Sequence, residues 1–225
     1  IITGSRRSRL CSTCRENSMT KIFLLIVSIY LFSGCTLLQK PPAPLSVYDF
    51  GSQLSQHPEP TQQPSSHQRR ILIADASAPP WLNNNAMHYR LLFNNPTQSY
   101  TYAQSRWIAP PASVLTQQIR NRIVTHANGL VVKENGTAKA DYILQIELEE
   151  FMQAFDQAND SHVVILLRAS LIERNSRQLL AQKDFSIQQK TPSADAAGAA
   201  FAFSSASNQL VSKLTDWLAI QLPAN

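Results

Sequence analysis

The chain has 225 residues, of which 44% are hydrophobic and 16% charged, and its formal net charge is +5. That charge is concentrated at the start, where residues 1–34 hold five of the 20 Lys and Arg but only one of the 15 acids. The remainder has 20 − 5 = 15 bases and 15 − 1 = 14 acids, a net of +1. This balance gives no reason to expect a nucleic-acid partner.

Residues 19–34 predict a lipoprotein signal peptide. Lys21 supplies a cationic start, and the apolar run 22–32 is shorter than the roughly 20 residues that a membrane-spanning helix needs. Leu31-Phe32-Ser33-Gly34-Cys35 has the pattern of a bacterial lipobox. We therefore expect Cys35 to carry a covalent lipid, a diacylglycerol joined by a further acyl chain, which would form a stable membrane anchor. A buried helix ending in Gly-Cys is disfavoured because Pro41-Pro42 follows closely.

Residues 1–18 precede a candidate initiator, Met19, and we expect them to be an upstream extension that is not native to the protein. They include Cys11 and Cys14, which have no second pair or nearby His to complete a zinc site. Processing would leave Cys35 as the only cysteine, so no disulfide is expected. Thr36 is not the aspartate that retains many lipoproteins at the inner membrane. We therefore expect the outer membrane, with the protein facing the periplasm.

Residues 35–70 are expected to be the lipidated Cys and a tether rich in Pro and Gln. Such a segment is semi-stiff, and at about 3.1 Å per residue it would reach on the order of 100 Å when extended. One part, Val47–Gly51, has strand-like alternation and could be ordered.

Residues 71–222 are expected to form a single α+β domain, with a mainly antiparallel sheet and two principal helices packed on one face. Alternating and apolar runs predict the strands, 3.6-residue periodicity predicts the helices, and the links Gln153–His162 and Glu173–Gln178 favour an antiparallel meander. The expected strands are 71–74, 87–93, 99–107, 130–132, 142–149, 163–172 and 179–189, and the expected helices are 112–126 and 193–222.

Catalytic and metal-binding patterns are not found in the sequence. It has no nucleophile elbow, no Gly-rich phosphate loop and no His-Glu-x-x-His. The three domain histidines (His88, His126 and His162) are better explained as surface or core residues. Glu147 and Glu149 fit the polar face of a strand. We expect neither an enzyme nor a metal site.

Four residues are candidates for a partner or ligand surface: Tyr89, Arg90, Arg106 and Trp107. Tyr89-Arg90 and Ser105-Arg106-Trp107 are expected on neighbouring strands, where Arg and Trp could share a face. For Trp107 we favour a structural role in a cluster that holds the hairpin onto the first helix. The Ala-rich run 194–203 is similarly better explained by core packing than by subunit contact.

The chain resembles the ABC-type transport auxiliary lipoproteins over most of residues 45–222. The lipobox, Tyr48-Asp49-Phe50-Gly51 and Ile71-Leu72-Ile73-Ala74 fit the start of that family. Its most specific part here is Tyr89-Arg90-Leu91, then Tyr102-Ala103-Gln104-Ser105-Arg106-Trp107 leading through Pro110-Pro111 into a helix. The strands around 141–146 and Phe185 fit the same pattern.

The resemblance implies a PqiC-like lipoprotein working with an MCE-domain protein and an ABC permease and ATPase. Such a system would move phospholipid or other hydrophobic compounds between membranes, with the ATPase doing the chemistry. Some relatives form rings, so homo-oligomerisation is compatible with the resemblance. Two alternatives stay open: an assembly lipoprotein of another envelope machine (lipopolysaccharide insertion or secretion), and an independent lipid- or ligand-binding domain.

Overall fold

Residues 22–23, 44–51, 70–126, 130–132 and 139–222 are described by the structure, a computed structural model. Cys35, most of the predicted signal peptide and much of the predicted tether lie outside these residues. The fold described below belongs to the unit that begins at Pro44.

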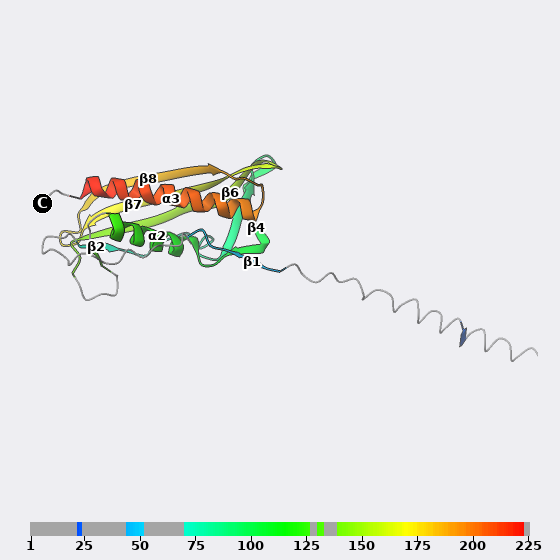
Figure 1. The fold of residues 1–225 in the computed structure, drawn as a ribbon, viewed down its shortest axis with the longest axis horizontal. Helices are drawn as coiled ribbons and strands as arrows, with labels where there is room; N and C mark the ends of the chain where they lie inside the picture. Colours follow the sequence, from blue (N-terminus) through cyan, green and yellow to red (C-terminus); the bar gives the residue numbers. More distant parts are fainter. Residues whose placement is uncertain (1–21, 24–43, 52–69, 127–129, 133–138, 223–225) are drawn as a thin grey trace, which may run out of the picture. The chain divides into compact units, whose positions relative to one another are not determined.

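The described residues of this unit form one mixed eight-stranded sheet and two helices (Figure 1). The fold class is therefore α+β, as predicted. The strands are β1 (Ser46–Tyr48), β2 (Arg70–Ile73), β3 (Ala86–Leu91), β4 (Asn95–Trp107), β5 (Leu130–Val132), β6 (Tyr142–Gln157), β7 (Asp160–Glu173) and β8 (Leu179–Lys190); the helices are α2 (Pro111–His126) and α3 (Ala196–Gln221).

Strand β6 organises the sheet because three other strands pair with it. One edge pairs antiparallel with β7, which in turn pairs with β8. The other edge pairs parallel with β2 near Tyr142 and with β3 near Gln153. Beyond β2 lies β5, and beyond β3 lie β4 and then β1. The predicted β6–β7–β8 meander and β3–β4 hairpin are both present.

The link predicted between β6 and β7, Gln153–His162, is too long. Strand β6 continues to Gln157 and β7 begins at Asp160, so a tight turn joins them. The reason is that residues 151–155 are all buried, which stabilises them as strand rather than loop. Polar Gln153 is satisfied by hydrogen bonds inside the domain.

Residues 44–51 belong to the folded unit. Strand β1 pairs parallel with the end of β4, in the register Val47↔Arg106 and Tyr48↔Trp107. Phe50 is 1% exposed and packs against Trp107 at a ring separation of 5.1 Å. The stretch before the first strand is thus much shorter than the predicted tether of 35–70.

Both helices contribute apolar faces to a single core. On α2 these are Leu115, Ile119 and Ile123, spaced four residues apart. On α3 they include Leu210, Leu214, Trp217 and Leu218, which are all buried. Helix α3 lies along α2 and packs on β7 and β8 (Figure 1).

Candidate functional site

Tyr89 lies in a cluster of aromatic rings at the middle of β3. It stacks on Tyr100 of β4 at 5.3 Å and contacts Tyr102 at 4.8 Å and Phe155 at 5.6 Å between ring centroids. These partners come from β4 and β6, so the ring of Tyr89 holds three strands together. This packing explains the aromatic residue at position 89, so no bound ligand is needed to explain it.

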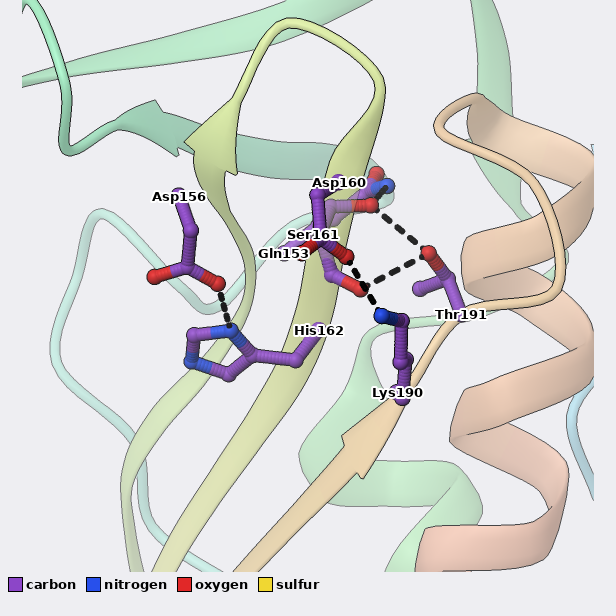
Figure 2. A network of polar contacts seen from close by, with 7 residues as sticks. All are labelled: Gln153, Asp156, Asp160, Ser161, His162, Lys190 and Thr191. Carbon is purple, nitrogen blue, oxygen red and sulfur yellow. Dashed lines mark hydrogen bonds and ion pairs between the residues drawn. The ribbon is translucent and has the colours of Figure 1, made fainter.

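The hydroxyl of Tyr102 begins a chain of hydrogen bonds that enters the core. It donates to Gln153 Oε1 at 2.7 Å, and Gln153 Nε2 donates to Ser161 Oγ at 2.9 Å. Ser161 Oγ lies 2.6 Å from Thr191 Oγ1, just before α3 (Figure 2). Burial, with smaller contributions from Tyr89 and Asp195, raises the pKa of Tyr102, so the phenol stays protonated. This network joins β4, β6 and β7 to Thr191, the residue that follows β8.

A hydrogen bond between Asp156 and His162 and an ion pair between Asp160 and Lys190 flank this network on the surface. Asp156 Oδ2 lies 2.8 Å from His162 Nδ1, and Asp160 Oδ1 lies 3.0 Å from Lys190 Nζ (Figure 2). Exposed pairs of this kind contribute at most about 1 kcal/mol each. They fit a structural role at the β6–β7 turn.

Arg90 lies two residues from His88 on the same strand, so the two side chains leave the same face of the sheet. Its Nη1 is 3.5 Å from Glu150 Oε1, and its Nε is buried without a hydrogen-bond partner among the residues that the structure describes. His88 Nε2 is also buried and has no hydrogen-bond partner in the described part of the chain, and burial lowers the pKa of His88. The side chain of Arg90 is therefore paired with β6 rather than fully exposed to solvent.

Trp107 does not lie on the surface. It is 1% exposed and packs edge-on against Phe50, Phe151 of β6 and Phe203 of α3, at 5.1, 5.7 and 5.4 Å between ring centroids. Trp107 is thus part of the core, and Phe203 of α3 is one of its ring partners.

Arg106 is separated from both Arg90 and Trp107. It pairs in register with Ala86, four residues before Arg90, which places the two arginines roughly 13 Å apart along β3. Its side chain is exposed and lies on the face opposite Trp107, beside Val47 of β1. The four predicted residues therefore do not form one surface.

Sequence reasoning missed the apolar neighbours of Arg106. Leu45, Val47 and Ile108 are 46%, 50% and 57% exposed, and the amide of Ile108 donates to the carbonyl of Tyr48 at 2.9 Å. We call Leu45, Val47, Arg106 and Ile108 the β1 edge. Two short alternating runs in the sequence, Leu45-Ser46-Val47 and Arg106-Trp107-Ile108, indicate side chains on one face of a strand. They point to a shared surface only once the pairing of β1 with β4 is known.

A shallow cavity of about 290 Å³ adjoins the β1 edge, between Gly51, Ile108 and the outer face of α2. Its volume is at the lower end of the range for small-molecule sites. Gln118 Nε2 donates to the carbonyl of Phe50 at 3.1 Å, while its Oε1 is buried and finds no hydrogen-bond partner within the described ranges. The cavity is too small and open to enclose a lipid.

Two carboxylates of β6, Glu149 and Glu150, are paired with cations. Glu149 lies 3.4 Å from Arg168, which also binds Asp184 at 2.7 Å, and Glu150 pairs with Arg90. Across the described residues there is no group of three or more His, Cys, Asp or Glu able to hold a metal. In the same residues no helix is long and apolar enough to cross a membrane.

The fold is a mixed-sheet α+β domain. The family model described as "ABC-type transport auxiliary lipoprotein component" matches residues 53–215. The chain belongs to this family, as the resemblance in its sequence indicated. The family name associates its members with ABC-type transport.

Solved structures similar to this chain share its fold. Protein XCC0632 from Xanthomonas campestris gives a TM-score of 0.61 at 20% identity, covering 81% of this chain and 90% of that one. An uncharacterised protein gives 0.58 at 15% identity, covering 78% and 99%. The hypothetical protein CT253 from Chlamydia trachomatis gives 0.50 at 11%, covering 70% and 99%. No curated protein matches the chain.

Proposed function

We propose that this chain is a lipoprotein anchored through Cys35 to the inner leaflet of the outer membrane, where it serves an ABC transporter as a non-catalytic component. In this proposal its partners are an MCE-domain protein with its permease and ATPase. The cargo is phospholipid or another hydrophobic compound moving between the membranes.

The family match over residues 53–215 carries the proposal. The lipobox ending at Cys35 lies upstream of the matched region, where an anchor would hold the domain at a membrane.

A crosslinking pull-down tests the proposal. The tagged full chain is recovered from envelope membranes after mild crosslinking, and its partners are identified by mass spectrometry. We expect an MCE-domain protein with its permease, and incorporation of a palmitate analogue at Cys35. The matched control is Cys35→Ala, which should lose the label and the membrane fraction.

Two results would overturn the proposal. Recovery of only barrel or secretion components would favour an assembly lipoprotein of another envelope machine. Copurified lipid without protein partners would favour an independent lipid-binding domain.

A further inference from the structure

The β1 edge places three exposed apolar side chains around one cation. Val47 and Arg106 are register partners and so share a face of the sheet, and Ile108 follows two residues later. Within the described part of the chain Arg106 forms no ion pair. The nearby carboxylate of Asp49 accepts the amide of Gly51 at 2.8 Å.

The covalent chain limits how far this edge can lie from Cys35. Leu45 follows Cys35 by ten positions in the chain. A chain spans at most about 3.3–3.6 Å per residue, so the two residues can be no more than about 35 Å apart whatever the conformation between them. This distance is close to the thickness of a bilayer's hydrocarbon core.

A short tether raises the effective concentration of whatever it holds near a surface. For short flexible linkers this concentration is in the millimolar range, so a weak contact is enough to keep the two surfaces together. Leu, Val and Ile beside an Arg suit an interface with anionic phospholipid. At such an interface the burial of apolar side chains and the attraction of the cation to the headgroups both contribute to the binding free energy.

We infer that the β1 edge docks on the phospholipid surface to which the lipidated Cys35 is anchored. The inference rests on the proposed lipidation and deepens it by giving the domain an orientation. Leu45, Val47 and Ile108 enter the headgroup region, and Arg106 pairs with lipid phosphate.

Two other exposed apolar sites provide matched controls. Phe93, 52% exposed, lies in the β3–β4 turn at the far end of β4, a strand of 13 residues that measures up to about 40 Å. Ile220, 78% exposed, lies near the C-terminal end of α3 (Figure 1). If docking uses the β1 edge, neither site reaches the membrane.

The test measures lipid contact at each site. Lipidated full-length protein carrying Ile108→Cys, Phe93→Cys or Ile220→Cys is labelled with bimane. It is reconstituted in phosphatidylethanolamine–phosphatidylglycerol vesicles containing a brominated phospholipid, and flotation separates bound protein. We expect bimane quenching at position 108 to be at least twofold stronger than at 93 and 220. Val47→Cys gives a second reporter on the same edge.

Charge reversal at Arg106 tests the role of the cation. In the Ile108→Cys background, Arg106→Glu should shift the equilibrium away from the docked state about fivefold for each unit of charge lost at an anionic surface. The effect should shrink in phosphatidylcholine vesicles. Circular dichroism checks that each variant is folded.

The outcomes separate the two proposals. Protein that fails to float overturns the Cys35 anchor, and with it this inference. Protein that floats but shows equal quenching at 108, 93 and 220 overturns the docking alone and leaves the anchor standing. Quenching at 108 that Arg106→Glu leaves unchanged overturns the contribution of lipid phosphate.

Discussion

Neighbouring residues Arg106 and Trp107 have opposite environments, although the sequence placed both on one candidate surface. Trp107 faces the aromatic rings of the core, while Arg106 is exposed beside β1. Strand alternation requires this separation, because successive side chains leave opposite faces. An Arg-Trp dipeptide in a strand therefore cannot present both side chains to one partner.

Replacing Trp107 measures its contribution to the core. Trp107→Ala should lower the free energy of unfolding by about 3–5 kcal/mol, because it leaves a cavity among Phe50, Phe151 and Phe203. Trp81→Ala is the control, since Trp81 is 41% exposed, and should cost less than about 1 kcal/mol. Urea denaturation measures both. Similar small losses would show that Trp107 does not support the core.

Gly198 is required by a close approach of backbone to backbone. A Cβ added there would lie 2.8 Å from the amide nitrogen of Ser193 and closer still to its carbonyl oxygen. Gly→Ala in a helix normally stabilises by about 1 kcal/mol. Here we expect Gly198→Ala to destabilise by about 1–3 kcal/mol, because two backbone segments must move apart. A gain in thermal stability would contradict the expectation, and the exposed Ala197→Gly, which should show the ordinary helix preference, provides the control.

At the scale of elements, β4 shows why the face of Tyr102 and Trp107 was hard to predict. The register of β4 against β3 shifts between Ala86↔Arg106 and His88↔Thr101. An irregularity of this kind interrupts the two-residue period, so positions on either side of it cannot be assigned to faces by counting. Nothing in the alternation of aromatic and polar residues marks where it occurs.

Helix α3 begins with a carboxylate cap. Asp195 Oδ1 accepts the amide of Gly198 at 2.7 Å and the hydroxyl of Ser193 at 2.8 Å, and these bonds lower the pKa of Asp195. A carboxyl group whose pKa is lowered by folding stabilises the fold above its unfolded pKa of about 3.9. That stabilisation is lost as the pH falls through the lower folded value.

Removing this cap should therefore have a pH-dependent cost. Asp195→Ala should lower the free energy of unfolding by about 0.5–2 kcal/mol at pH 7, and the difference from the unmodified protein should shrink below about pH 4. Asp195→Asn keeps the acceptor without a titrating charge, so its stability should change less over the same range. Thermal melts from pH 3 to 7 measure this, and a constant difference for Asp195→Ala would contradict the assignment.

For the whole molecule, the sequence predicted those elements and pairings that depend on residues close together in the chain. Helices α2 and α3, the β3–β4 hairpin and the β6–β8 meander follow from periodicity and short links. The parallel pairs of β6 with β2 and β3, and of β1 with β4, join distant segments and leave no local pattern. The β1 edge depends on one of these pairs, which is why only Arg106 of its four residues was a candidate from sequence.

The position of β6 also sets the order in which the fold can form. A chain is made from its N-terminus, so β2 and β3 are complete before the strand that both require, with 71 residues separating Ile71 from its partner Tyr142. The β6–β7 hairpin closes over a tight turn, whereas the parallel pairs must first close long loops at an entropic cost. Strand β3 can already pair with β4, but β2 and β3 both wait for their β6 partner, with apolar side chains such as Ile71 and Met87 uncovered, until the hairpin provides a template. During that interval the first half of the domain depends on protection from aggregation that the finished fold no longer needs.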